Sequence, residues 1–199
     1  CCVRRWPAGS NHERLRAIHR LTAHIAALGV DQIPVPLRDD FGETLILDGQ
    51  DVWQVERWMP GVADFHYRPS GERLKSAMIV LARWHSAATL FRPSEADREW
   101  LTESAIAPSR TLRERCESID FLASRLPDIE RGITAETDAG FREVAVRVAL
   151  QFRRFHCQTL NELSDWIETA VPVQPCLRDV WHDHLLFSDD ELTGLIDFG

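Results

Sequence analysis

The sequence predicts an α+β fold, in which a small antiparallel sheet is followed by a mainly helical part. Three observations lead to this prediction: strand-like runs dominate residues 1–59, apolar residues recur at helical spacing after Pro60-Gly61, and two more strand-like runs close the chain. A chain of 199 residues suits one domain or two small lobes. We therefore expect a first lobe over residues 1–59 and a second over residues 60–199.

The first lobe is predicted to contain three strands and one helix. The helix has leucine and isoleucine at helical spacing and ends before Gly29. Two of the strand-like runs are joined by a segment that contains Asp48-Gly49, a pair typical of tight hairpins. The expected elements are strands at residues 1–6, 43–47 and 52–58, and a helix at residues 12–28.

The second lobe is predicted to be built from long amphipathic helices. The first begins near Ser70, a favourable capping residue, and continues to about Leu90. The others are expected over residues 111–126 and 138–168. Their apolar faces predict core positions and a buried structural histidine at His85: Leu74, Ala77, Met78, Leu81 and Ala88; Leu112, Cys116, Ile119, Leu122 and Leu126; Phe141, Ala145, Val148, Phe152, Phe155, Leu163 and Trp166.

Composition excludes several classes of protein. The net charge is −8 and no basic run occurs, which argues against nucleic acid as a partner. No apolar run approaches the length of a membrane helix, and because the first residues lack a basic stretch before an apolar one, we expect no signal peptide. The five cysteines show no C-x-x-C spacing, so we expect reduced thiols in the cytoplasm. Of the 23 basic residues only Lys75 is a lysine, so a site that needs a specific cation has one lysine or must use arginine.

The C-terminal stretch carries the densest set of ionisable residues. Asp179 is followed five residues later by His184 and eighteen residues later by Asp197, and an apolar hairpin lies between the last two. Polar residues beside a rigid hairpin often hold a reaction site. The alternative is structural, because aspartates also cap turns and strand ends.

This pattern resembles the aminoglycoside phosphotransferase and choline kinase-like family, a branch of the protein-kinase-like fold. The family motif places an aspartate and a metal-binding residue before a hairpin that ends in Ile-Asp-Phe-Gly, as in residues 196–199. Three other segments are similar to the family's phosphate-binding strand, adenine-bordering hinge and first long helix of the second lobe. They are Val3-Arg4-Arg5-Trp6-Pro7, Glu56-Arg57-Trp58-Met59-Pro60-Gly61 and Leu81-Ala82-Arg83-Trp84-His85.

The resemblance implies a two-lobed fold and transfer of the γ-phosphate of ATP, or GTP, to a hydroxyl group of a small molecule. The acidic net charge favours a cationic acceptor. In that reaction Asp179 is the catalytic base, and Asp197 and His184 hold Mg²⁺ or Mn²⁺. The remaining implied roles belong to the nucleotide: Arg4 binds its phosphates, and Glu56 and Trp58 border its adenine.

The sequence also departs from the family pattern. Leu177 and Arg178 replace the motif histidine and glycine, and His184 replaces the metal-binding asparagine; imidazole suits Zn²⁺ or Mn²⁺ better than Mg²⁺. No carboxylate stands near Leu21, where the helix glutamate is expected. The family's glycine-rich loop is expected before residue 1, so we expect a fragment that lacks both ends.

Two alternatives remain open at this stage. One is a degenerate, non-catalytic nucleotide-binding module. The other is a metal-dependent hydrolase that uses His182, His184 and an aspartate, either Asp183 or Asp179.

Overall fold

The computed structural model describes residues 1–177 and 179–197, and the chain forms two compact units. The first unit comprises Cys1–Ala105 and Gln174–Gly199, and the second comprises Ile106–Val173. The expected boundary between residues 59 and 60 lies inside the first unit. The predicted mixture of helices and antiparallel strands is confirmed.

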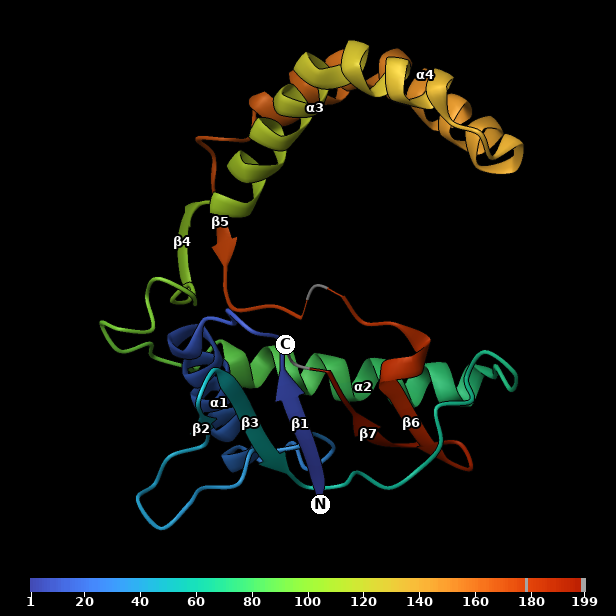
Figure 1. Ribbon diagram of the computed structural model, residues 1–199. Coiled ribbons are helices and arrows are strands. Elements are labelled where there is room, and N and C mark those ends of the chain that lie inside the picture. The colour runs from blue at the N-terminus through green and yellow to red at the C-terminus, as the bar shows by residue number, and fades with distance from the viewer. Residues whose placement is uncertain (178, 198–199) are drawn as a thin grey trace. The chain divides into compact units, whose positions relative to one another are not determined.

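A three-stranded antiparallel sheet forms one part of the first unit (Figure 1). Its strands are β1 (Cys2–Trp6), β2 (Ile46–Asp48) and β3 (Asp51–Glu56), in the order β1-β3-β2. Asp48 pairs with Asp51, so Gly49 and Gln50 form the predicted hairpin turn, and Gly49 has a positive φ of 62°. Alternate residues of β3 are buried: Val52, Gln54 and Glu56. The inner face of β3 is therefore unusually polar.

Helix α1 (His12–Ala27) matches the predicted helix closely. The Asn11 side chain accepts a hydrogen bond from the backbone N–H of Arg14 and caps the helix. Leu15 packs with Leu45 and Val52, while Leu21 and Ile25 join the main core of the unit.

Helix α2 (Gly71–Ala88) begins after Ser70, as predicted, but its predicted inner face is partly wrong. Leu74 and Met78 are more than half exposed, whereas Val80 and Trp84 are buried with Ala77 and Ala88. The helix packs against both α1 and β7, and these neighbours cover the stripe through Ala77, Val80 and Trp84. Leu74 and Met78 lie beside this stripe and face solvent.

A short 3-10 turn, η1 (His182–His184), leads into the predicted C-terminal hairpin of β6 (Leu185–Ser188) and β7 (Glu191–Leu195). Phe187, Leu192 and Leu195 are buried in the same core as α2. Val62 pairs with Phe187 through two backbone hydrogen bonds of 2.9 and 3.0 Å. This close approach requires Gly61, which has a φ of 105° and at which a Cβ atom would overlap Thr193 Oγ1.

A buried arginine joins three segments of the first unit. Arg73, at the start of α2, is 2% exposed; its Nη1 lies 2.6 Å from Asp64 Oδ1, and its Nε donates to the Asp189 carbonyl oxygen at 2.8 Å. The guanidinium also lies 4.9 Å above the Phe187 ring. The β6–β7 turn is thereby tied to α2 and to the segment before it.

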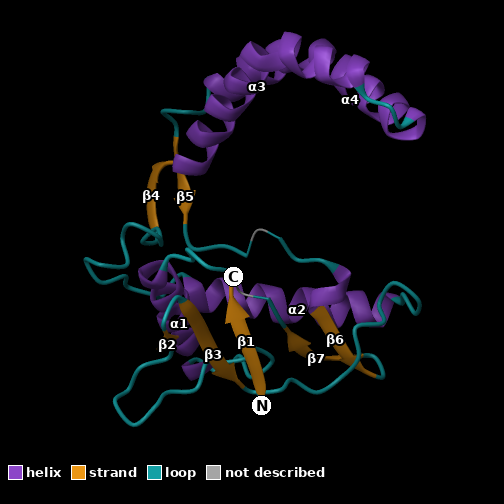
Figure 2. Ribbon diagram, viewed as in Figure 1, coloured by secondary structure: helices purple, strands orange, loops and turns teal. Residues whose placement is uncertain are grey.

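The second unit is a helical hairpin on a two-stranded sheet (Figure 2). Strands β4 (Ala105–Pro108) and β5 (Ala170–Val173), which the sequence analysis did not predict, form the sheet. Helices α3 (Arg110–Ala135) and α4 (Ala139–Ser164) follow the predicted segments, although α3 continues through Pro127.

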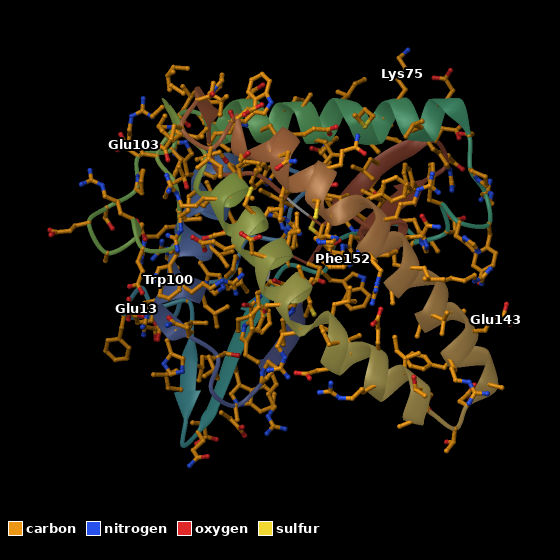
Figure 3. All side chains as sticks on the ribbon, turned by 90° about the horizontal axis from the view of Figure 1, so that it is seen from above. Glu13, Lys75, Trp100, Glu103, Glu143 and Phe152 are labelled. Carbon is orange, nitrogen blue, oxygen red and sulfur yellow. The ribbon has the colours of Figure 1, made fainter. Side chains whose placement is uncertain are left out.

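The core faces predicted for these two helices are confirmed in part: of the twelve predicted positions, two are buried, five are half-buried and five are exposed. The helices pack on each other, but only Cys116, Leu126 and Ala149 are fully buried. Two packed helices bury only a narrow stripe, so wide apolar faces stay exposed. Figure 3 shows the side chains of this unit, including Phe152. Predicted core residues that are exposed here are Leu122, Phe141, Val148, Phe155 and Trp166.

Across residues 1–177 and 179–197, no helix has the length and apolar character needed to cross a membrane.

Candidate functional site

The candidate site centres on the carboxylate of Asp197, two residues after β7. Arg4 Nη1, on β1, lies 3.0 Å from Asp197 Oδ1. His184 Nε2, at the end of η1, lies 3.4 Å from Asp197 Oδ2. Three residues that the sequence analysis placed in one site, and that are up to 193 positions apart, are therefore in contact.

The backbone around Asp197 explains how the hairpin presents this carboxylate. The Ile196 N–H donates to the His184 carbonyl oxygen at 3.0 Å, which extends the pairing of β6 and β7 beyond the strands. Asp197 itself has a φ of 70°, in the left-handed region that few residues other than glycine adopt. Unusual backbone conformations of this kind are concentrated at functional sites. Phe198 and Gly199, which complete the predicted motif, lie outside the described residues.

His184 also contacts the segment that carries Asp179. Its Nδ1 lies 3.2 Å from the Asp179 carbonyl oxygen and 3.4 Å from the Trp181 backbone nitrogen. If Nδ1 carries the proton, it donates to Asp179 and leaves a lone pair on Nε2. If Nε2 carries the proton, it donates to Asp197 and Nδ1 accepts from Trp181. The Asp179 side chain is exposed.

His85 holds the start of the same segment. The Leu177 N–H donates to His85 Nε2 at 3.3 Å, and Gln174 Nε2 donates to the His85 carbonyl oxygen at 3.4 Å. His85 is partly rather than fully buried, which corrects the prediction of a buried histidine. It anchors the loop at Leu177, where the sequence lacks the family's histidine. Arg178, the next residue of the motif, lies outside the described residues.

Arg4 is the cation that the first strand contributes. Its guanidinium lies 5.2 Å from the centre of the Trp6 ring, which packs against it on the same face of β1. The single lysine, Lys75, is exposed on α2 and extends away from the chain (Figure 3). The sheet therefore supplies an arginine to the Asp197 carboxylate.

A buried polar chain extends from α1 to the end of β3. His19 Nε2 and Trp6 Nε1 both donate to Gln54 Oε1, at 2.9 and 2.8 Å, and Gln54 Nε2 donates to Glu56 Oε2 at 2.7 Å. His19 Nδ1 accepts from the Thr44 hydroxyl at 2.8 Å. These contacts fix the orientation of the Gln54 amide, because the reverse orientation would set its NH₂ group against two donors.

Burial governs the protonation of His19 and Glu56 in this network of polar side chains. It lowers the pKa of His19 from 6.5 to about 4, so the ring is neutral at pH 7. Burial also raises the pKa of Glu56, while the nearby Arg4 charge and the Gln54 hydrogen bond oppose that rise.

The two residues predicted to border adenine are placed differently. The Glu56 side chain is 7% exposed and points into the polar chain, whereas Trp58, beyond the end of β3, is 71% exposed. Their predicted roles at the adenine stay predictions.

Sequence reasoning missed His19 and Gln54. A usable signal was present, because polar residues at positions 54 and 56 alternate with apolar ones in a strand whose inner face must be buried.

The side chains around Asp197 fit a divalent cation that takes only one or two of its ligands from the protein. Mg²⁺ is usually held by one or two carboxylates together with water and phosphate oxygens, and Asp197 offers one half-exposed carboxylate. His184 adds an imidazole nitrogen, which suits Mn²⁺ or Zn²⁺ better. His182 Nδ1 instead contacts Asp183 Oδ1 at 2.6 Å. No group of three or more His, Cys, Asp or Glu side chains in the described residues is arranged to hold a metal ion.

Comparison with known proteins places this geometry in context. A structure described as an aminoglycoside phosphotransferase from Alicyclobacillus acidocaldarius subsp. acidocaldarius DSM 446 superposes with a TM-score of 0.61 at 15% sequence identity. The match covers 98% of this chain and 56% of that one, so this chain spans little more than half of the similar protein. It confirms the protein-kinase-like fold of the aminoglycoside phosphotransferases. No curated protein matches the sequence significantly.

The profile described as "Phosphotransferase enzyme family" matches residues 1–199, the whole length of the sequence. The resemblance drawn from the C-terminal motif is thereby confirmed, and the chain belongs to the phosphotransferase enzyme family.

Proposed function

We propose that this chain carries the site of a small-molecule kinase, which transfers the γ-phosphate of ATP to a hydroxyl group of its substrate. The observation that carries the proposal is the meeting of Arg4 and His184 on the two oxygens of Asp197, at 3.0 and 3.4 Å. Phosphoryl transfer needs a cation for the phosphates, a carboxylate for the metal and a base for the acceptor. Membership of the phosphotransferase family supports the same reaction.

Each role falls to a residue with suitable chemistry. Arg4 would bind phosphate oxygens through its planar guanidinium, and Trp6 keeps that group in place. Asp179 would orient the acceptor hydroxyl and take its proton, for which its exposed side chain is accessible. The hinge after β3, with Trp58, would border the base of the nucleotide.

Asp197 would hold Mg²⁺, with His184 next to it as a ligand for Mn²⁺ or as a hydrogen-bond donor to the carboxylate. The metal supplies charge neutralisation at the phosphates. Because His184 is an imidazole, we expect Mn²⁺ to support the reaction at least as well as Mg²⁺.

The acceptor is proposed as a small molecule with a hydroxyl group and a positive charge. The net charge of −8 supports a cationic acceptor, and the exposed aromatic ring of Trp181 lies two residues from Asp179. We place the reaction in the cytoplasm, where ATP and reduced thiols are available.

The test is transfer of labelled γ-phosphate from ATP to a panel of aminoglycosides, amino sugars, choline-like amino alcohols and homoserine-like compounds. Asp179→Asn should lower kcat about 10²- to 10⁴-fold without loss of folding. Asp183→Asn is the matched control, because Asp183 lies on the same segment and is also exposed, but its carboxylate contacts His182 Nδ1 at 2.6 Å.

Binding of Mg·ATP without transfer to any acceptor would instead favour the non-catalytic nucleotide-binding module. A stabilising shift with Zn²⁺ alone, and none with nucleotide, would favour the hydrolase.

A further inference from the structure

Glu56, which the family resemblance places at the border of the adenine, has a buried carboxylate that such a place does not by itself require. It is 7% exposed at the end of β3. Burying a carboxylate is costly unless hydrogen bonds and a cation compensate. Gln54 Nε2 donates a hydrogen bond to Glu56 at 2.7 Å, and Arg4 lies on the same face of the sheet, although its ion pair is with Asp197.

The strand register shows which cation Glu56 faces. Arg4 on β1 pairs directly with Gln54 on β3, so Glu56 is its diagonal neighbour on the same face of the sheet. Long side chains reach one another across such diagonals. The Gln54 amide holds Glu56 from the other side, and the neutral His19 ring holds Gln54.

Helix α1 has no carboxylate near Arg4 that could take the place of Glu56. Its single acidic residue is Glu13, in the first turn (Figure 3). Glu13 Oε1 pairs with Arg16 Nη1 at 2.8 Å. The nearest α1 side chain in the polar chain is therefore the uncharged His19.

We propose that Glu56 is the carboxylate that positions Arg4 for the phosphates of a nucleotide, and that Gln54 and His19 hold Glu56 in place. The sheet, rather than α1, then supplies the carboxylate that orients the phosphate-binding cation. This inference rests on the proposed function, because it assigns Arg4 to nucleotide phosphates.

The experiment compares the affinities of Mg·ATP and of adenosine, measured by isothermal titration calorimetry on the 199-residue chain. Glu56→Gln keeps the size and the hydrogen bond of the side chain but removes its charge. It should weaken Mg·ATP binding about three- to tenfold, because a long arginine side chain must then be ordered on binding. Adenosine affinity should stay within about twofold, since adenosine has no phosphate for Arg4 to bind.

Asp51→Asn is the matched control. Asp51 lies on the same strand and accepts hydrogen bonds from the neighbouring arginine, Arg5, at 2.8 and 3.1 Å. Its loss should change neither affinity. Glu56→Asp, which keeps the charge on a shorter stem, should bind Mg·ATP with intermediate affinity and also serves if Glu56→Gln does not fold. In an Arg4→Met background, Glu56→Gln should have no further effect on Mg·ATP.

Four results would overturn the inference. Equal loss of Mg·ATP and adenosine affinity would assign Glu56 to the adenine or to folding alone. Unchanged or tighter Mg·ATP binding in Glu56→Gln would show that its charge does not position Arg4. If the unmodified chain binds Mg·ATP no more tightly than adenosine, Arg4 does not bind the phosphates of the nucleotide. Failure of the unmodified chain to bind either compound would overturn the proposed function, and the inference would fall with it.

Discussion

Replacing His19 with glutamine should flatten the acid side of the stability profile of this protein. His19 is 5% exposed, and both of its ring nitrogens are hydrogen-bonded, to Thr44 and to Gln54. Glutamine can keep a hydrogen bond to Gln54, but it does not titrate. The difference between the two proteins therefore isolates the proton that His19 takes up.

The magnitude follows from the two pKa values. Above pH 6.5, His19 is neutral in the folded and the unfolded chain, so the full stability is present. As the pH falls from 6.5 towards about 4, the unfolded chain binds a proton that the folded chain does not, and the free energy of unfolding decreases. At about 1.4 kcal/mol per pH unit, this interval corresponds to a loss of about 3 kcal/mol.

Urea unfolding followed by tryptophan fluorescence between pH 4 and 7.5 measures this loss. The wild-type chain should lose about 3 kcal/mol more than His19→Gln over that range. His66→Gln, at an exposed histidine, should keep the wild-type slope. The titration of the His19 ring protons can be followed separately by NMR.

The reasoning is refuted if His19→Gln and the wild type lose stability in parallel. A His19 ring that titrates near pH 6.5 in the folded protein would refute it as well, because burial would then have no effect on its protonation.

Two further predictions concern stability, both measured as the free energy of urea unfolding. Arg73→Met should lower the free energy of unfolding more than Arg68→Met does, because Arg73 is the buried partner of Asp64 at 2.6 Å and also donates to the Asp189 carbonyl oxygen. Arg68 is an exposed and more distant partner of the same carboxylate. Equal effects would show that burial of Arg73 is unimportant. Gly61→Ala should cost about 2–5 kcal/mol, from the positive φ and the overlap at the added methyl group. Gly42→Ala, with a positive φ but open space, should cost about 1–2 kcal/mol, so similar losses would contradict the overlap at Gly61.

Local signals predicted most of the first unit. Ser70 precedes a helix because its side chain caps the helix, and Gly49 occupies a tight turn that joins β2 and β3. The motif resemblance put His184 and Asp197 in one site, and the structure places His184 Nε2 3.4 Å from Asp197 Oδ2. These features depend on residues close in sequence or on a motif with fixed spacing.

The predictions failed where packing partners decide. Periodicity defines an apolar stripe on a helix, but it does not say what covers that stripe, so Met78 was placed inside and Val80 was overlooked. The contact of Arg4 with Asp197 could be expected only from the family resemblance, because β1 and the β6–β7 hairpin belong to separate sheets. Likewise, Gln54 and His19 meet only because α1 packs on the inner face of the sheet.

The order of segments along the chain has a consequence for synthesis. The core of the first unit needs Phe187, Leu192 and Leu195, yet the whole second unit, Ile106–Val173, is translated before them. During translation the second unit can fold as a continuous stretch. Until β6 and β7 are synthesised, the apolar stripe of α2 stays exposed to solvent. Closing this long insertion costs little at equilibrium, because closure entropy grows only with the logarithm of length. The delay therefore affects the rate and the aggregation risk of folding more than the final stability.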